Sequence, residues 1–523
     1  MNPKPPRVTA YDLVVGIYSQ REHHKQDMAW MIVTGVIICF ITSLCWWLLR
    51  ENNKKKKKKK VVRKGKVPEG RWGWPIIGET LDFIASGYTS QPQPLTFLEK
   101  RKSMYGNVFK TSILGSSVIV STEVEVNKVV LMNQGNMFVP AYPKSIRELM
   151  GEHSILHMNG TLHRKMHALI GGFLRSPHLK ARITTDIERA VKQCLATWTS
   201  HQSIYVQDQV KMITFSVLVK VLMSVGAGEE LKLLKKEFEE FIKGLICLPL
   251  KFPGTRLYKS FDEMHACMQA KERMVKIVKR IIEERKKKKK EKASNEEEKD
   301  VVDVVLGNEW NPELTLEMMS SNIIEMMIPG EETLPTAMTI ALFFLSNSPL
   351  ALSKLREENM QLKRQKSSSP NSSDEYAWTD YMSLQFTQNV ISETLRMANI
   401  VNGIWRKAVK DVEIKGYLIP KGWCVMASLT SVHLDSNNYE NPFKFDPWRW
   451  EKIGAAASNN CFTPFGGGQR LCPGLELSRL ELSIFLHHLV TTYRWVAETD
   501  EIIYFPTVKM KRKLPISVEP INA

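Results

Sequence analysis

The chain has 523 residues and a formal net charge of +18 at neutral pH, and its length suffices to bury a large core. Much of the charge is local, because Lys54–Lys60 supplies seven positive charges and Lys286–Lys290 supplies five more. No aromatic residues alternate with these lysines, which argues against a base-stacking groove and a nucleic-acid partner. The eight cysteines lack the spacing of a zinc site or a disulfide framework, which indicates a reducing compartment for the globular part.

The first apolar segment, Met28–Leu49, contains no charged residue and is long enough to cross a bilayer as a helix. Tryptophans stand near both of its ends, as in interfacial anchors. Positive charges are concentrated after this segment, so the body is expected in the cytosol. We therefore predict a lumenal segment 1–27, a transmembrane anchor 28–49, a basic flank and Pro/Gly hinge 50–75, and a cytosolic catalytic domain 76–523.

The body is expected to be mainly helical with small sheets, an α+β domain. A β-branched stretch, Val108–Val120, is bounded by turn residues and is predicted to form strands. Long helical patterns follow at Leu179–Trp198, Met212–Met223, Glu229–Gly244 and Glu263–Arg285. Two low-complexity inserts, Lys286–Asp300 and Lys366–Asp374, are predicted to be surface loops. Later short strands are expected at Val412–Leu418 and Cys424–Ser428.

Two helical segments carry unusual polar residues. The apolar stretch Ser320–Phe344 is interrupted at Pro329–Thr333, and a local kink is expected because proline lacks the N–H donor of a helix. In the predicted helix Gln388–Ala398, Glu393 and Arg396 are spaced i, i+3 and therefore share one face. On an exposed surface such a pair would contribute little to stability.

The most informative segment is Phe465–Gly474, which reads Phe-Gly-Gly-Gly-Gln-Arg-Leu-Cys-Pro-Gly. It precedes a helix-like run, Leu475–Val490, so Cys472 is predicted near a helix N-terminus, where the dipole and free N–H groups lower the pKa of a thiol. The glycines are expected to let the backbone approach a large flat group, and Arg470 offers a fork for a carboxylate. A buried structural cysteine in a glycine-rich turn is the alternative.

The complete order Phe-x-x-Gly-x-Arg-x-Cys-x-Gly resembles the haem-binding signature of the cytochrome P450 family. The resemblance implies the fold of that family, with Cys472 as the axial thiolate ligand of a haem b iron and with Phe465 and Arg470 in the cofactor site. It also implies the use of O2 and of electrons from NADPH through a membrane-bound NADPH-cytochrome P450 reductase. No Gly-x-Ser-x-Gly, His-Glu-x-x-His or Walker-type sequence indicates a rival chemistry.

The same resemblance assigns roles to the interrupted apolar helix. It implies that Gly330 opens space over the iron, that Thr333 hydrogen-bonds the bound oxygen molecule, and that Glu332 helps to deliver protons. Pro329 stands where a small residue is usual, and Leu334 stands where a second hydroxyl is usual. The helix is therefore expected to bend differently while the acid and the threonine remain.

Further roles come from the same resemblance. His163 and Arg406 are implied to face the haem propionates, and the bidentate donors of an arginine suit a carboxylate. His167 stands where an arginine is more usual, so a haem contact and a plain core or surface role both stay open. A structural brace is implied for one acid and two arginines: Glu393, Arg396 and Arg449.

Segments outside the signature resemble the plant brassinosteroid-synthesising branch of the family: Phe138–Lys144, Leu250–Thr255 and Val412–Tyr417. Met326–Thr333 resembles the enzymes of that branch that hydroxylate the steroid side chain at C-23. This implies C-22-hydroxylated steroids such as 3-epi-6-deoxocathasterone as substrates, and the endoplasmic reticulum membrane as the location. Apolar candidates for the steroid pocket, which core packing would explain equally well, are Met326, Met327, Val401, Ile404, Phe505 and Val508.

Three other functions stay open on the sequence alone. The first is hydroxylation of a steroid at C-22 or of a terpenoid. The second is a haem-thiolate isomerase or dehydratase that needs no reductase, against which the presence of Glu332 and Thr333 argues. The third is a membrane-anchored steroid-binding protein that carries no haem.

Overall fold

The computed structural model describes residues 65–521 apart from 76, 88–95, 134, 152, 201, 246–258, 292–299, 308–314, 369–375, 454–460 and 506, and before them only residues 35, 39, 42, 43 and 46. Segment 1–27, nearly all of the predicted anchor 28–49, most of the flank 50–75 and the segment 250–255 therefore lie outside the described residues. Within the described helices, none taken singly is long and apolar enough to span a bilayer. One bent pair, Leu316–Ser346 with Pro349–Ser367, satisfies length and composition together.

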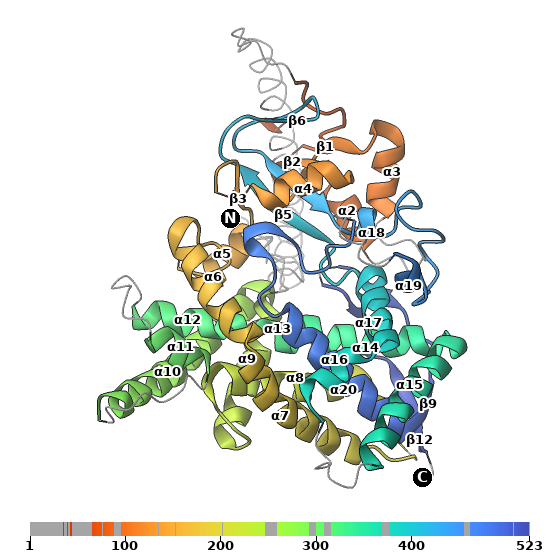
Figure 1. The fold of residues 1–523 in the computed structure, drawn as a ribbon. Helices are drawn as coiled ribbons and strands as arrows, with labels where there is room; N and C mark the ends of the chain where they lie inside the picture. Colours follow the sequence, from red (N-terminus) through yellow and green to blue (C-terminus); the bar gives the residue numbers. More distant parts are fainter. Residues whose placement is uncertain are drawn as a thin grey trace, which may run out of the picture.

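The chain forms a smaller sheet-rich part and a larger helical part (Figure 1). The main sheet has five strands in the order β1-β2-β8-β5-β3, and β2 pairs with β8 in parallel while the other neighbours are antiparallel. Buried Val and Ile side chains of these strands pack between the sheet and the first helices. The strands of this sheet are β1 (Val108–Ile113), β2 (Ser116–Ser121), β3 (Phe138–Pro140), β5 (Gly403–Ala408) and β8 (Cys424–Ser428).

The expected strands in Val108–Val120 and at Cys424–Ser428 are confirmed. Val412–Leu418, expected as one strand, is instead a hairpin of β6 (Val412–Ile414) and β7 (Tyr417–Ile419). Lys415 and Gly416 turn the chain there with φ of 50° and 79°, a conformation that glycine adopts freely. The remaining small sheets are formed by β4 (Ile204–Tyr205), β9 (Tyr493–Ala497) and β12 (Pro515–Pro520), and by β10 (Ile502–Ile503) and β11 (Lys509–Met510).

Helices build the rest of the described chain, and most predicted helical segments are confirmed within a few residues. The lysine run Lys286–Lys290, expected in a loop, continues α10 instead, which ends at Glu291. The helices that follow the first strands are α4 (Val124–Met132), α5 (Lys144–Met150), α6 (Gly160–Arg175), α7 (Pro177–Ala196), α8 (Val206–Met223), α9 (Glu229–Leu245), α10 (Lys259–Glu291) and α11 (Val301–Gly307), with α2 (Thr80–Ser86) and α3 (Thr96–Tyr105) before them. The later helices are α15 (Pro349–Ser367), α16 (Trp378–Ser383), α17 (Gln385–Ala398), α18 (Thr430–His433), α19 (Arg449–Ile453), the 3₁₀ turn η2 (Gly468–Arg470) and α20 (Leu475–Thr492).

The long apolar helix is broken where the sequence predicts it. Its three pieces are α12 (Leu316–Met326), α13 (Ile328–Glu331) and α14 (Thr333–Ser346). Pro329 lies in the first turn of α13, where a missing N–H costs nothing. Helix α14 is buried on nearly all sides among α8, α17 and α20, as expected of a central helix that is apolar all round.

Candidate functional site

The cysteine loop, Phe465–Gly474, is a closed turn that leads into α20. The backbone N–H of Cys472 donates to the carbonyl of Phe465 at 3.0 Å, and Gly466 turns the chain with a φ of 75°. Gly474 is the N-cap of α20, so the predicted position of the cysteine before a helix N-terminus is confirmed.

The expected lowering of the thiol pKa is wrong for the protein without a metal. Burial raises the pKa of the Cys472 thiol, and the backbone N–H of Gly474 only partly opposes this effect. Desolvation disfavours the thiolate more than a single N–H donor favours it. A bound metal cation reverses that balance, because thiol ligands bind metals in deprotonated form.

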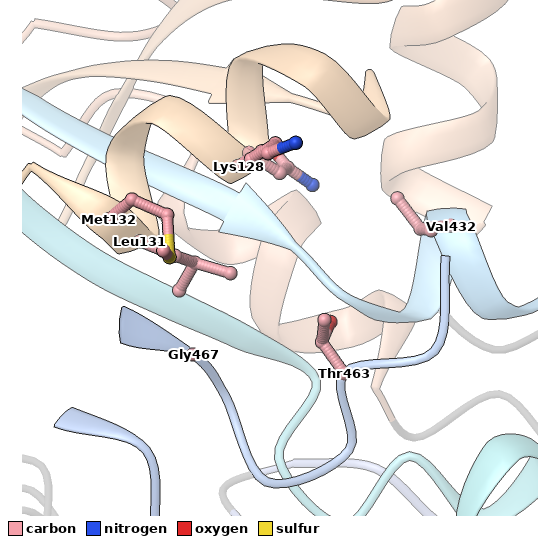
Figure 2. Close-up of a pocket in the computed structure, with 7 residues that line it drawn as sticks. Lys128, Leu131, Met132, Val432, Thr463 and Gly467 are labelled. Carbon is pink, nitrogen blue, oxygen red and sulfur yellow. The ribbon is translucent and has the colours of Figure 1, made fainter. Parts of the chain in front are cut away.

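The glycines of the loop serve a contact within the protein. A Cβ on Gly468, whose φ is 65°, would lie 2.4 Å from the carbonyl oxygen of Leu131, and one on Gly467 would lie 3.6 Å from the Leu131 side chain. Figure 2 shows the small pocket between α4 and the loop, with Lys128, Leu131 and Met132 facing Thr463 and Gly467. Gly467 and Gly468 therefore approach α4, and the approach of the loop to a large flat group stays a prediction.

Two arginines, the half-buried Arg470 and the buried Arg406, belong to the same site. Arg470 donates to the carbonyls of Ile155 at 3.2 Å and Leu156 at 3.0 Å and also to that of Met158. Arg406 on β5 is 5% exposed and donates to the carbonyl of Trp405 at 3.0 Å. Within the described part of the chain neither arginine pairs with a carboxylate, and the Nε atom of each is buried without a hydrogen-bond partner.

Electrostatics confirm that these two charges are poorly compensated. Burial lowers the pKa of Arg406, and burial together with the charge of Arg406 lowers the pKa of Arg470 to about 10. Two neighbouring buried cations are costly unless anions bind between them. A haem with two propionate carboxylates fits this donor set, whose forked N–H groups match carboxylates. Cys472, Arg406 and Arg470 are therefore the residues that would hold it.

The two histidines of α6 contact this region differently. His163 is 4% exposed, and burial together with the charge of Arg470 lowers its pKa to about 3, so the ring is neutral. The Nε2 atom of His167 lies 2.7 Å from the carbonyl oxygen of Leu471, and it donates there because a carbonyl can only accept. His167 thus secures the residue before Cys472.

The interrupted helix places its polar residues in different surroundings. Thr333 Oγ1 donates to the carbonyl of Pro329 at 3.4 Å. Burial raises the pKa of Glu332, and Lys211 partly opposes this. Thr507 donates to Glu332 across 3.5 Å, a long hydrogen bond that leaves the carboxyl group loosely held.

Gly330 and Glu331 have packing roles. A Cβ on Gly330 would lie 3.2 Å from the carbonyl oxygen of Thr214 in α8, so the space above Gly330 is filled by that helix. The role of Gly330 in opening space over the iron stays a prediction. Glu331, which the sequence did not single out, is 3% exposed and forms ion pairs with Lys211 at 2.9 Å and with Lys235. No local signal distinguishes it from Glu332, because its partners lie about a hundred residues earlier in the chain.

The structure brings the implied brace together. Arg396 donates through Nε and Nη2 to Glu393 at 2.9 and 2.8 Å, and Arg449 donates to the same carboxylate at 3.2 Å. Trp450 adds an N–H donor to Glu393 at 3.0 Å. Every member is almost fully buried, and the carboxylate is saturated with donors.

The apolar pocket candidates are dispersed. Met327 and Val508 are buried in the main core, and Met326 packs against it. Ile404 packs against the cluster of the main sheet, Phe505 belongs to a third cluster, and Val401 is 40% exposed. The described residues therefore do not unite these six side chains in one apolar cluster.

Two aromatic residues near the arginines were not assigned to the site from the sequence. Tyr142 and His157 stand edge to face with ring centres 5.2 Å apart. Burial raises the pKa of Tyr142, while Arg406 and Arg470 oppose this. In the sequence, the segment that contains Tyr142 indicated only a branch of the family. Residue spacing does not reveal that this ring lies near Arg406 and Arg470 in the fold.

Comparisons with known proteins agree with this site. The chain is 61% identical over 464 residues, 88% of this chain and 86% of the relative, to 3-epi-6-deoxocathasterone 23-monooxygenase CYP90C1 of Arabidopsis thaliana. It is 52% identical to a second Arabidopsis enzyme of that name, CYP90D1, over 87% of this chain and 90% of that one. It is 42% identical to the Arabidopsis 3beta,22alpha-dihydroxysteroid 3-dehydrogenase over 87% of this chain and 93% of that one.

A solved structure, retinoic acid-bound cyanobacterial CYP120A1, is similar with a TM-score of 0.74 at 25% identity, over 87% of this chain and 100% of that one. The cytochrome P450 family model matches residues 68–518, which include the cysteine loop, both arginines and the brace. This match and the identity to the relatives show that the chain belongs to the cytochrome P450 family.

Proposed function

We propose that this chain is the monooxygenase that hydroxylates C-23 of C-22-hydroxylated steroid intermediates, such as 3-epi-6-deoxocathasterone, in brassinosteroid biosynthesis. The observation that carries the proposal is the 61% identity over 88% of the chain to an enzyme named for this reaction, with a second such enzyme at 52%. The haem-compatible site supports the reaction class.

We assign a separate role to each residue of the site. Haem, once bound, supplies the chemistry that activates O2. Cys472 provides the thiolate ligand, Arg406 and Arg470 neutralise the two carboxylates, and His167 holds the cysteine loop against α6. Glu332 is the proton-holding group, since its raised pKa keeps a proton available closer to neutral pH. We assign the relay of that proton to the Thr333 hydroxyl, which donates to the Pro329 carbonyl at 3.4 Å.

We also propose the cellular setting that the sequence predicts. The chain is anchored by residues 28–49 in the endoplasmic reticulum membrane, with the catalytic domain in the cytosol and residues 1–27 in the lumen. A membrane-bound reductase delivers electrons from NADPH. The supporting observations are the uncharged stretch Met28–Leu49 and the lysine run after it. Protease protection of the N-terminus in sealed microsomes tests this topology, and its digestion from the cytosolic side would contradict it.

The decisive experiment is product analysis with the full chain in vesicles. The purified protein is first checked for the CO-difference band of a thiolate-ligated haem. It is then supplied with the reductase, NADPH and isotope-labelled 3-epi-6-deoxocathasterone, and the products are identified by mass spectrometry and NMR. We expect a single new hydroxyl at C-23 whose oxygen comes from labelled O2. Insertion at C-22, oxidation at C-3 or turnover without NADPH would contradict the proposal.

A further inference from the structure

Residues 153–159, which precede α6, lie beside the site without being part of the signature. Three consecutive residues of this segment bind one face of α12. Asn322 accepts from the backbone N–H of Ile155 at 2.7 Å and donates to the carbonyl of His153 at 3.3 Å. Glu325, one turn further along α12, accepts from the hydroxyl of Ser154 at 2.7 Å. The segment is therefore attached to the helix that leads to the oxygen-side residues.

The same segment is attached on its other side to the cysteine loop. Arg470 donates to the carbonyls of Ile155 and Leu156 at 3.2 and 3.0 Å, and these carbonyls set the orientation of its guanidinium group. Lys271 of α10 holds the chain just before the segment through the carbonyls of Leu149, at 3.0 Å, and Met150, at 2.5 Å. The guanidinium of Arg470 is thus positioned by a segment that α12 and α10 fix.

The burial of Glu325 on α12 costs folding stability. Its side chain is 4% exposed, and its Oε1 atom is buried with no hydrogen-bond partner in the described part of the chain. Burial raises its pKa to about 7, although Ser154 and Lys271 oppose this. A buried, half-satisfied carboxyl group costs stability. In return, the hydrogen bond between Ser154 and Glu325 fixes the conformation of the segment.

We propose that Glu325 is a positioning residue for the haem site: through Ser154 it fixes the segment 153–158, whose carbonyls orient Arg470 toward one propionate. The inference rests on the proposed haem binding and not on the identity of the steroid. It joins α12, which leads to Glu332 and Thr333, to the loop that carries Cys472. Loosening Glu325 should therefore release haem without touching any residue that contacts it.

The test measures haem loss from the purified full-length holoprotein to an excess of apomyoglobin. We expect Glu325→Ala and Ser154→Ala each to accelerate the transfer by about tenfold, the scale of one lost buried hydrogen bond. The double variant should accelerate transfer by less than the product of the two single effects, because both single variants remove the bond between Ser154 and Glu325. Glu325→Gln keeps an acceptor for Ser154 and should stay within about twofold of the wild type, because the hydrogen bond and not the charge holds the segment.

The matched control is Glu481→Gln. Glu481 is another buried acid with an unpartnered oxygen, and burial raises its pKa to about 8, but it lies on α20. Its neutralisation should leave haem transfer unchanged. Equal acceleration in Glu481→Gln, additive effects of the two alanine variants, or unchanged transfer in both would overturn the proposal.

A second readout, hydrogen exchange by mass spectrometry, does not depend on turnover. Peptides that cover 153–159 should lose protection in Glu325→Ala and Ser154→Ala and keep it in Glu325→Gln. Unchanged protection in the alanine variants would contradict the positioning role. If Glu325→Ala does not fold, Ser154→Ala and Glu325→Gln still decide the question. A steroid hydroxylated at another carbon leaves this result intact, so the two proposals fail separately.

Discussion

Two pairs of arginines in this protein have opposite surroundings. Arg396 and Arg449 share the carboxylate of Glu393, which accepts from both guanidinium groups and from Trp450. Arg406 and Arg470 donate only to backbone carbonyls and an amide oxygen, and each keeps a buried Nε atom without a partner among the described residues. Arg396, Arg449 and Arg406 are buried and Arg470 is half-buried, so the main difference between the pairs is the carboxylate partner.

The charge of a buried arginine is neutralised on folding when a carboxylate of the same chain pairs with it. A buried arginine without such a carboxylate can be neutralised by a bound anion. The first pair therefore stabilises the fold, and the second pair marks the ligand site. Desolvation lowers the pKa of both Arg406 and Arg470, and the charge of Arg406 lowers that of Arg470 further. Burial alone does not separate the two roles, because Arg406 is as buried as Arg396 and Arg449.

The largest expected effect comes from removing the shared carboxylate. Glu393→Ala leaves two guanidinium groups buried and unpaired, which should lower the free energy of unfolding by about 3–5 kcal/mol. Denaturant unfolding followed by circular dichroism measures this. The control is Glu498→Ala, which breaks the exposed pair with Arg512 and should cost at most about 1 kcal/mol. Similar losses in both variants would refute the structural role of the brace.

The second pair should respond in the opposite sense. Arg406→Met removes a poorly compensated charge, so the haem-free protein should unfold with an equal or higher free energy, whereas haem affinity should fall by about 100-fold. Haem titration and denaturant unfolding of the same preparation measure both quantities. Arg396→Met is the matched comparison and should lower stability in the haem-free state. If Arg406→Met instead lowered the free energy of unfolding of the haem-free protein, Arg406 would stabilise the fold as Arg396 and Arg449 do.

The loop that carries Arg470 depends on close contact with α4. Gly468→Ala combines a φ of 65° with a Cβ placed 2.4 Å from the Leu131 carbonyl, and we expect a loss of about 2–3 kcal/mol in stability. Gly422→Ala has a φ of 83° but nothing within 4 Å of its Cβ, so it should cost only about 1 kcal/mol. Thermal unfolding of both variants separates backbone strain from the contact. Equal costs would exclude the contact with α4 as the reason for Gly468.

The smallest expected effect is on the pH dependence of the unfolding free energy, through His433 beside Arg396 of the brace. Burial and the charge of Arg396 lower the pKa of His433 to about 3, below the ordinary 6.5 of the unfolded chain. The unfolded chain then binds more protons between pH 6.5 and 3, so stability is full above this window and is lost as the pH falls through it. His433→Gln should reduce the slope of unfolding free energy against pH by up to about 1.4 kcal/mol per unit. An unchanged slope would mean that His433 is protonated in the folded protein.

Sequence reasoning succeeded where the information is local or where a complete motif is present. The strands around Val108–Val120, the break at Pro329 and the cysteine before α20 are set by propensity, proline geometry and glycine spacing. It cannot reveal contacts with distant segments. Gly468 packs against Leu131 and Gly330 packs against α8, and burial of the thiol overrides the effect of the helix dipole on the pKa of Cys472. The missing counter-charge of Arg406 is also visible only once the fold shows what surrounds it.

The most direct test of the contrast between the two arginine pairs uses two forms of the cofactor. The haem-free protein and Arg406→Met are titrated with haem and with its dimethyl ester, which lacks both propionate charges. We predict that the wild type binds haem at least about tenfold more tightly than the ester, and that Arg406→Met discriminates much less. Equal discrimination by the two proteins would contradict the claim that the uncompensated arginines are the propionate site.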